Sequence, residues 1–286
     1  MKTLICATDY SQNSVAALKL ANVLRKKLDC KLYIVHVFDI RATFISTVSI
    51  AYARMEEAAF RDHNARLLDF SIEHLGRDAQ SDKVEIVVGE NSIASQGILE
   101  KAKVVDPDLI LVGMKGSSPV REFLMGSTAS ALIEKSEFPV VTVPPNFDEY
   151  QINSIVYATA FEEADIIAVE KILDFTKAFN ASLKLIHIST KDEYAGQDQL
   201  QWFREMLESR IGQVDLPIDV RTSEDVFQAL NDYLDEEKPD MMVMLERENH
   251  HLISNLWHRD LVKRMKLEID IPLMSFHKKN LMQKQE

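Results

Sequence analysis

The stretch from residue 108 to residue 144, DLILVGMKGSSPVREFLMGSTASALIEKSEFPVVTVP, places a glycine-rich loop between two apolar runs of this 286-residue chain. Residues 108–113 form a nearly continuous apolar run, which predicts a strand that is buried on both faces. A glycine-rich loop follows, then a predicted helix over residues 127–135 and a second apolar strand over residues 139–144. This order of elements is typical of a parallel sheet that is covered by helices.

The same alternation of strands and helices continues toward the N-terminus. Short apolar runs predict three more strands, at residues 2–9, 31–39 and 83–88. Helical spacing of apolar residues predicts three helices between them, over residues 11–28, 52–76 and 93–104. Ser11 is a plausible N-cap of the first helix. The sequence therefore predicts an α/β fold with a parallel sheet, helices on both faces and right-handed crossovers.

Residues 153–188 align without a gap on residues 2–37, which indicates an internal repeat. The segments KPDMMVML from Lys238 and IDIPLMSF from Ile269 repeat the last two strands of the first copy. The repeat depends on matched element order and apolar pattern, and two unrelated α/β domains are the alternative. We predict one domain over residues 1–146 and another over residues 152–280.

Length and composition indicate ordinary globular domains. A chain with 46% hydrophobic and 27% charged residues can form two complete cores. The net charge of −12 disfavours binding to nucleic acid or to a membrane surface, because both need basic residues. Asp9 interrupts the apolar run near the N-terminus and no run is long enough to cross a membrane, so we expect a cytosolic protein. Cys6 and Cys30 lie outside any CxxC pair, and we expect reduced packing residues.

The loop after residue 112 is unusual because the chain has only 8 glycines and three of them lie in it, Gly113, Gly116 and Gly126. The loop begins where a strand ends and finishes where a helix begins, which is where ligands bind in open parallel sheets. Gly113 and Gly116 would allow close approach of a sugar or phosphate. The N–H groups of Gly126, Ser127 and Thr128 would receive phosphate oxygens at the helix start. A loop that merely turns tightly before a helix is the alternative.

Neither of the common phosphate motifs, GxxxxGK[ST] and GxGxxG, is present. The spacing G-x2-G-x9-G-[ST] from Gly113 to Ser127 instead resembles the loop of ATP-binding members of the universal stress protein family. The segments CATDYSQNS, VHV and PVVTVP resemble the ends of that family's first, second and last strands. The resemblance implies two tandem flavodoxin-like domains, of the adenine nucleotide alpha hydrolase-like type, each with a five-stranded parallel sheet flanked by helices.

The resemblance also implies an ATP site, with Mg, in the N-terminal domain. The implied contacts are Asp9 and Val37 at the adenine end, Gly113 and Gly116 at the ribose and phosphates, and Gly126, Ser127 and Thr128 at the phosphates. A role as an N-cap or turn residue is the alternative for Asp9. Lys115 and Arg121 also lie in the loop, but isolated surface charges are usually only solvated, so we do not assign them to the site.

The second copy lacks the glycine loop. The five loop positions from Gly113 to Thr128 align with Leu245, Glu248, His258, Arg259 and Asp260, and Ala160 replaces Asp9. Side chains would block approach to the backbone, and the carboxylates of Glu246, Glu248 and Asp260 would repel phosphates. We predict that the C-terminal domain binds no ATP and that the chain holds one nucleotide.

Histidines and methionines supply weaker candidates. The group His250, His251 and His258 could bind a metal, but no ligand spacing is diagnostic and a solvated loop is the simpler interpretation. His36 and His187 recur at the same strand end in both copies, and we predict buried histidines with satisfied hydrogen bonds. We interpret the methionines of a predicted strand as core residues, namely Met241, Met242 and Met244.

The resemblance implies a regulatory or protective factor of the stress response that binds an adenine nucleotide and is not an enzyme. It further implies a homo-oligomer, an internal pseudo-dimer of the two repeats, and an unidentified protein partner for the second domain. Two alternatives stay open. A weak ATP hydrolase would need a positioned base and a metal-holding carboxylate, which the loop does not supply. An interaction module without any ligand would keep the glycines only as inherited loop geometry.

Overall fold

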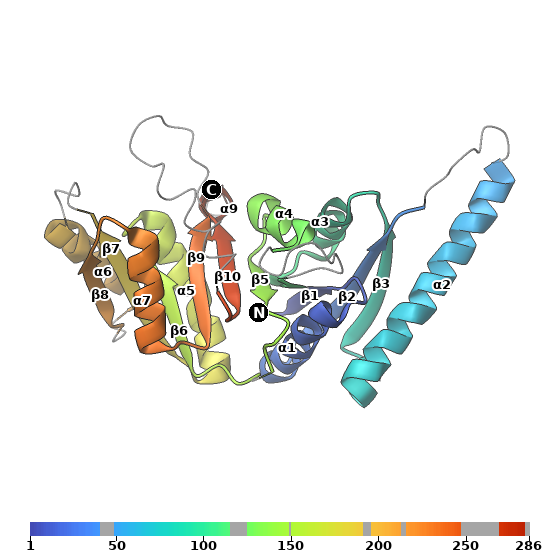
Figure 1. The fold of residues 1–286 in the computed structure, drawn as a ribbon, viewed down its shortest axis with the longest axis horizontal. Coiled ribbons are helices and arrows are strands. Elements are labelled where there is room, and N and C mark those ends of the chain that lie inside the picture. The colour runs from blue at the N-terminus through green and yellow to red at the C-terminus, as the bar shows by residue number, and fades with distance from the viewer. Residues whose placement is uncertain are drawn as a thin grey trace. The chain divides into compact units, whose positions relative to one another are not determined.

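A computed structural model describes residues 1–40, 49–114, 125–148, 150–190, 196–212, 216–246 and 269–283. The chain divides into two compact units (Figure 1). The first unit contains Met1–Leu132 and Val140–Tyr150, and the second contains Ile133–Pro139 and Gln151–Glu286. No helix in the described ranges is long and apolar enough to span a bilayer.

Strands and helices alternate in the first unit as predicted. Its elements are β1 (Thr3–Ala7), α1 (Gln12–Leu28), β2 (Lys31–Phe38), α2 (Ser49–Leu75), η1 (Gly76–Gln80), β3 (Val84–Glu90), α3 (Ala94–Val105), β4 (Leu109–Gly113), α4 (Ser127–Lys135) and β5 (Val140–Val143). The strands lie in the order β3-β2-β1-β4-β5 and are parallel in each of these pairs. The chain therefore leaves the neighbouring strands β1 and β4 toward opposite edges of the sheet, which makes their carboxyl ends the topological switch point.

The second unit repeats this topology. Its elements are β6 (Ser154–Ala158), α5 (Glu163–Phe179), β7 (Ser182–Ser189), α6 (Gly196–Ile211), β8 (Ile218–Thr222), α7 (Val226–Glu237), β9 (Met241–Glu246), β10 (Leu273–His277) and α9 (Lys278–Gln283). Its strands lie in the order β8-β7-β6-β9-β10, which corresponds strand for strand to the order in the first unit. The predicted repeat and the flavodoxin-like α/β fold are confirmed.

The central strands are buried on both faces, as their unbroken apolar sequences predict. Each residue of β4 is buried, and so is each residue of β9. Neighbouring residues of β1, such as Leu4 and Ile5, are both fully buried although their side chains point to opposite faces. Continuous apolar runs are the mark of parallel strands that are covered by helices on both sides.

A carboxylate at the start of the fourth strand anchors the first strand in both units. Asp108 accepts hydrogen bonds from the backbone N–H groups of Lys2 (2.5 Å) and Thr3 (3.0 Å). The corresponding Asp240 accepts from the N–H groups of Asn153 (2.6 Å) and Ser154 (2.9 Å). These bonds satisfy backbone donors at the amino end of the sheet, and their recurrence shows that the DPD and KPD segments are equivalent.

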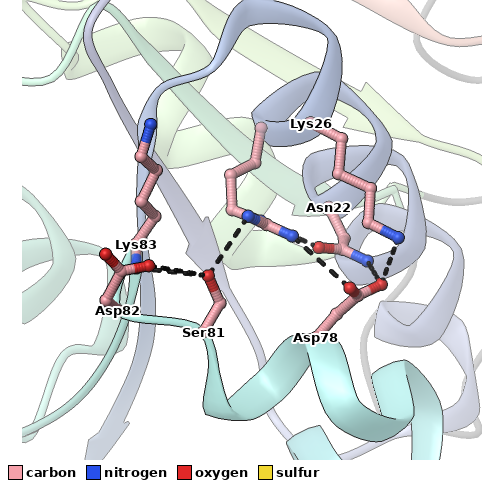
Figure 2. Close-up of polar contacts among 7 residues, drawn as sticks. Asn22, Lys26, Asp78, Ser81, Asp82 and Lys83 are labelled. Carbon is pink, nitrogen blue, oxygen red and sulfur yellow. Dashed lines mark hydrogen bonds and ion pairs between the residues drawn. The ribbon is translucent and has the colours of Figure 1, made fainter.

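A polar cluster joins α1 to η1 in the first unit (Figure 2). Asp78 of η1 accepts a hydrogen bond from the Asn22 amide (2.9 Å) and forms an ion pair with Lys26. The buried Arg25 guanidinium donates to Asn22 (3.0 Å) and lies 3.7 Å from the other oxygen of Asp78. Because α1 follows β1 and η1 precedes β3, the cluster ties distant parts of the sequence together. The second copy has Leu173 and Thr176 in place of Asn22 and Arg25, so this cluster belongs to the first unit.

We expect the stabilisation from Asp78 to be lost in acid. The pKa of its carboxyl is lowered, chiefly by the hydrogen bond from Lys26 and next by that from Asn22. A carboxylate with a lowered pKa stabilises the fold above its unfolded pKa, and this stabilisation disappears as the pH falls through the folded pKa. Asp78→Asn should therefore cost the first unit about 1 kcal/mol at neutral pH, because the pair is partly exposed, and almost nothing well below pH 3.8.

The free energy of unfolding of the first unit is measured by urea titration of the chain, with hydrogen exchange in α1 and β3 as the readout. Asp82→Asn is the matched control, since this exposed carboxylate accepts only a 3.3 Å hydrogen bond from Ser81 among the contacts of the described residues. It should change the free energy of unfolding by less than about 0.5 kcal/mol. A cost for Asp78→Asn that is the same at both pH values would show that the charge has no role.

Candidate functional site

The candidate site lies at the carboxyl ends of β1 and β4. Ala7 pairs with Val112, so Asp9, which follows β1, and Gly113, the last residue of β4, come together at the same edge of the sheet. Gly113 in turn pairs with Val143 of β5. This edge is the switch point of the first unit, the place where open parallel sheets bind ligands.

Gly113 lacks a side chain because helix α1 occupies the space beside it. A Cβ atom at this position would lie 2.6 Å from the backbone oxygen of Asn13 and 3.2 Å from the Cα of Ser14. The glycine thus lets the first turn of α1 rest directly on the end of β4. In the second unit the aligned residue is the buried Leu245, and α5 and β9 are not among the closely packed pairs of elements in the described ranges. The glycine and the close helix therefore occur together.

Gly126 returns the chain to the strand end and starts α4. Its N–H donates to the carbonyl of Met114 (2.9 Å), and its own carbonyl accepts the first helical hydrogen bond, from Ser130 (3.0 Å). The N–H of Gly126, which we expected to be available to a phosphate, is therefore engaged within the protein. Ser127 and Thr128 follow as the first residues of the helix, and N–H groups at this position have no intrahelical acceptor. Ser127 is exposed and offers a hydroxyl and an N–H at this position.

Asp9 forms a turn between β1 and α1. Its Oδ1 atom accepts hydrogen bonds from the backbone N–H of Ser11 (3.0 Å) and from the Ser11 hydroxyl (2.5 Å). Ser11 occupies the predicted N-cap position of α1, but its side chain accepts no bond from the helix. The turn role that we weighed for Asp9 is thus observed. Its side chain is nevertheless exposed, and a carboxylate has room for several hydrogen bonds, so a ligand contact is compatible with the turn.

The backbone of this loop is strained at Tyr10, which has a φ of 63°. Residues other than glycine seldom adopt this left-handed conformation. The Tyr10 N–H donates to the hydroxyl oxygen of Thr8 (3.1 Å), and that hydroxyl also shares a hydrogen bond with the Ser14 hydroxyl (2.7 Å). The loop that carries Asp9 is therefore held by β1 on one side and by the first turn of α1 on the other.

Val37 lies on the face of the sheet that packs against α3. A Cβ atom on Gly97 of α3 would come within 2.7 Å of a Val37 methyl group, so this helix also approaches the sheet through a glycine. Val37 is half-buried. Sequence reasoning did not single out Gly97, although a glycine inside a predicted helix is a recognised sign of close packing.

Several candidates lie outside the described residues. Among them are Gly116, Lys115 and Arg121 of the first copy, and Glu248, His250, His251, His258, Arg259 and Asp260 of the second. Within the described ranges, no group of three or more His, Cys, Asp or Glu side chains could hold a metal ion.

The equivalent loop in the second unit is built around a buried acid. Asp165, at the position of Ser14, is fully buried. Its carboxylate accepts hydrogen bonds from the hydroxyls of Tyr157 and Thr159 and from the N–H groups of Ala160 (2.9 Å) and Glu162 (3.0 Å). A carboxylate charge thus lies buried at this position, where the first unit has the Ser14 hydroxyl and carries its acid on the exposed Asp9 instead. This charge would repel a phosphate, independently of the missing glycines.

The structure confirms the predictions for the recurring histidines and for the methionines. Nδ1 of His36 lies 2.8 Å from the carbonyl oxygen of Thr8, and Nδ1 of His187 lies 2.9 Å from that of Thr159. Both histidines are buried and satisfied. The three methionines of β9 are buried in the core. Cys6 is buried too, which raises the pKa of its thiol to about 12 and agrees with a packing role.

Comparison with known proteins assigns the first unit to a family. The sequence model of the universal stress protein family matches residues 1–144. No curated protein matches the chain significantly.

Solved structures match both units. A universal stress protein from Archaeoglobus fulgidus aligns with a TM-score of 0.71 and 17% identity, over 96% of this chain and 98% of its own. A universal stress protein from Pseudomonas aeruginosa aligns with a TM-score of 0.66 and 10% identity, over 99% of this chain and 96% of its own. At such low identity these similarities establish the fold of the whole chain, and no more.

Proposed function

The chain belongs to the universal stress protein family, and on this premise we propose that its first unit binds ATP, with Mg, as a cytosolic stress-response factor. The observation that carries the proposal is the start of α4, where exposed Ser127 presents an N–H and a hydroxyl beside the carboxyl ends of β1 and β4. The positive end of a helix dipole favours phosphate oxygens at this position.

We assign the ends of the nucleotide from the family resemblance. Ser127 and Thr128 would bind phosphate oxygens, and Gly126 positions both by its bond to Met114. Gly113, with Gly116 after it, would lie at the ribose and inner phosphates, and Asp9 and Val37 at the adenine end. Mg would be bound chiefly through the phosphates, as is common for this ion.

We propose that the second unit binds no nucleotide and serves assembly or partner contact. Leu245 fills the position of Gly113, and the buried carboxylate of Asp165 lies behind the switch point. The domains would span residues 1–146 and 152–280, and the first would be the nucleotide-responsive one. ATP that binds one conformation better would shift the population toward that conformation, by no more than its difference in affinity.

We do not propose an enzyme. The described groups of the proposed phosphate end are backbone N–H groups and a hydroxyl, which bind negative charge but supply neither a general base nor a metal-holding carboxylate. The competing function is an interaction module without a ligand, for which Gly113 would serve only the packing of α1. Nucleotide binding separates the two functions directly.

Calorimetry with ATP and Mg on the full chain, freed of co-purified nucleotide, tests the proposal. We expect one site per chain. Two sites would contradict our interpretation of the second unit, and no binding would favour the interaction module.

Ser127→Pro is the sharpest variant of the phosphate site. Proline is well tolerated at the first position of a helix, so this change removes the N–H and the hydroxyl without breaking α4. We expect ATP affinity to fall by about tenfold or more, which corresponds to the loss of hydrogen bonds to a charged group. Ser127→Ala, which removes only the hydroxyl, should have a smaller effect.

The matched control is Glu163→Pro, at the first position of α5 in the second unit. It should leave both affinity and stoichiometry unchanged. If the Ser127→Pro chain binds ATP with the same affinity as the unmodified chain, α4 does not contribute to the site.

A further inference from the structure

The loop that carries Asp9 is attached to α2 through Tyr10. The Tyr10 hydroxyl donates to the backbone carbonyl of His63 (3.2 Å), and the guanidinium of Arg66 lies 4.3 Å from the centre of the tyrosine ring. The edge-on ring of Phe70 is 5.7 Å away. These three partners all lie on α2, so a shift of this helix would change the contacts that hold Tyr10 and its loop.

Two histidine rings lie between the loop and the helix. The His36 ring of β2 lies 4.0 Å from the Tyr10 ring and 5.2 Å from the His63 ring, with which it is stacked. His63 also stacks on the Phe38 ring of β2, with 4.3 Å between the ring centres. The aromatic stack therefore runs from the loop through β2 to α2, and both of its histidines can take up a proton.

Protonation of this stack is unfavourable. Nδ1 of His63 is buried and has no hydrogen-bond partner among the described residues. Burial is the main cause that lowers the pKa of both rings, and the charge of Arg66 lowers both further. The hydrogen bond to the Thr8 carbonyl and, more weakly, the charge of Asp9 raise the pKa of His36, and the charge of Asp62 raises that of His63, but each is a weaker cause than burial. Tyr10 stays neutral, since burial raises its pKa to about 12.

The second unit keeps the geometry without the second histidine. Phe161, which corresponds to Tyr10, has a φ of 57° and stacks on His187 at 4.2 Å. Its other ring neighbour is Phe203 of α6, at 5.0 Å. The facing helix therefore contributes a phenylalanine ring, not a histidine, to this contact. The titratable ring is not needed to hold the strained loop, and it is present in the unit that keeps the glycine loop.

We propose that protonation of the stacked His36 and His63 rings releases α2 from the Asp9 loop and thereby weakens nucleotide binding in the first unit at acidic pH. This inference rests on the proposed function for its second half only. Without its ring partners, the left-handed backbone at Tyr10 is no longer compensated, so the turn at Asp9 relaxes.

The sign of the effect follows from the lowered histidine pKa. When α2 is detached from the Asp9 loop, the two histidines take up protons near pH 6.5, and when α2 is packed on the loop they do so only at lower pH. The packed state therefore loses stability as the pH falls below 6.5. The loss continues down to the folded pKa of the rings and then levels off. At neutral pH the stack is uncharged and the loop is held.

Hydrogen exchange on the nucleotide-free full chain tests the release itself. We expect residues 8–14 and the middle of α2 to lose protection on acidification, after correction for the pH dependence of intrinsic exchange. His63→Phe, which replaces one of the two titratable rings with a ring that takes up no proton, should reduce this loss. His74→Gln is the control on the same helix, because His74 contacts Phe70 but not Tyr10. Equal protection at both pH values in the unmodified chain would overturn the inference.

Calorimetry tests the link to the nucleotide. Between neutral pH and pH 5.5 the affinity of the unmodified chain for ATP and Mg should fall about fivefold or more beyond the change in His63→Phe. Protonation of ATP affects both proteins equally, so the difference isolates the protein. Identical pH dependence in the two proteins would overturn the inference. A chain that binds no ATP at either pH refutes the proposed function instead, and hydrogen exchange then decides the release alone.

Discussion

Replacing Asp165 with alanine is expected to lower the free energy of unfolding of the second unit by about 3 kcal/mol or more. The carboxylate is fully buried and accepts from two hydroxyls and two backbone N–H groups. Its removal leaves two buried hydroxyls and two part-buried N–H groups without this acceptor, and each fully buried unsatisfied group costs about 1–3 kcal/mol. Tryptophan fluorescence during urea unfolding measures the effect, because Trp202 and Trp257 both follow residue 151 in the sequence.

The first unit provides the matched control for this change. Ser14 occupies the position of Asp165, but its hydroxyl shares only one hydrogen bond with Thr8 and donates one to the Ser11 carbonyl. Ser14→Ala should therefore cost about 1 kcal/mol and leave the tryptophan-detected transition unchanged. An Asp165→Ala chain whose transition shifts no more than that of Tyr157→Phe, which loses a single hydrogen bond, would show that the carboxylate does not organise the loop.

Gly113→Ala is expected to destabilise the first unit by about 1–3 kcal/mol and to weaken ATP binding. The new Cβ would lie 2.6 Å from a backbone oxygen of α1, and the backbone of a helix cannot move aside as a flexible side chain can. The first turn of α1 must therefore shift away from β4, together with the turn formed by Asp9. Hydrogen exchange in α1 measures the destabilisation, and calorimetry measures the loss of affinity.

Gly89→Ala is the control for the size of the side chain. The nearest atom to a Cβ at Gly89 is the Cε of Lys101, 3.1 Å away at the end of a flexible chain. This variant should be close to neutral, and it gains from the smaller entropy of the unfolded chain. If both glycine variants have the same stability, the close approach of α1 does not explain Gly113.

The sequence predicted most of the fold because the fold depends on local patterns. Unbroken apolar runs identified β1, β2 and β4, and helical spacing identified α1 and α3. The repeat added the topology of the second unit, since equivalent patterns lead to equivalent strand orders. The predictions for His36 and His187 were right for a related reason. Each lies near the end of a strand whose neighbour, the first strand of its unit, offers a carbonyl acceptor.

The candidate site was predictable in its place but not in its contacts. The sequence could show that Gly126 precedes a helix, but the bond from its N–H to Met114 joins two ends of a loop and is visible only in three dimensions. The environment of Gly113 depends in the same way on α1, which precedes it by about 100 residues. Asp165 did not stand out in the sequence, because an acid near a helix start is an ordinary feature, and the partner that Gly97 packs against is visible only in the structure.

Periodicity and alignment along the chain were enough to establish the α/β class, the internal repeat and the position of the glycine loop at a strand end. Three-dimensional packing was needed to show that the Gly126 N–H is engaged, why Gly113 must lack a side chain, and that Tyr10 and two histidines connect α2 to the Asp9 loop. These features depend on atoms that are distant in sequence and a few ångströms apart in space, and packing alone brings such atoms together.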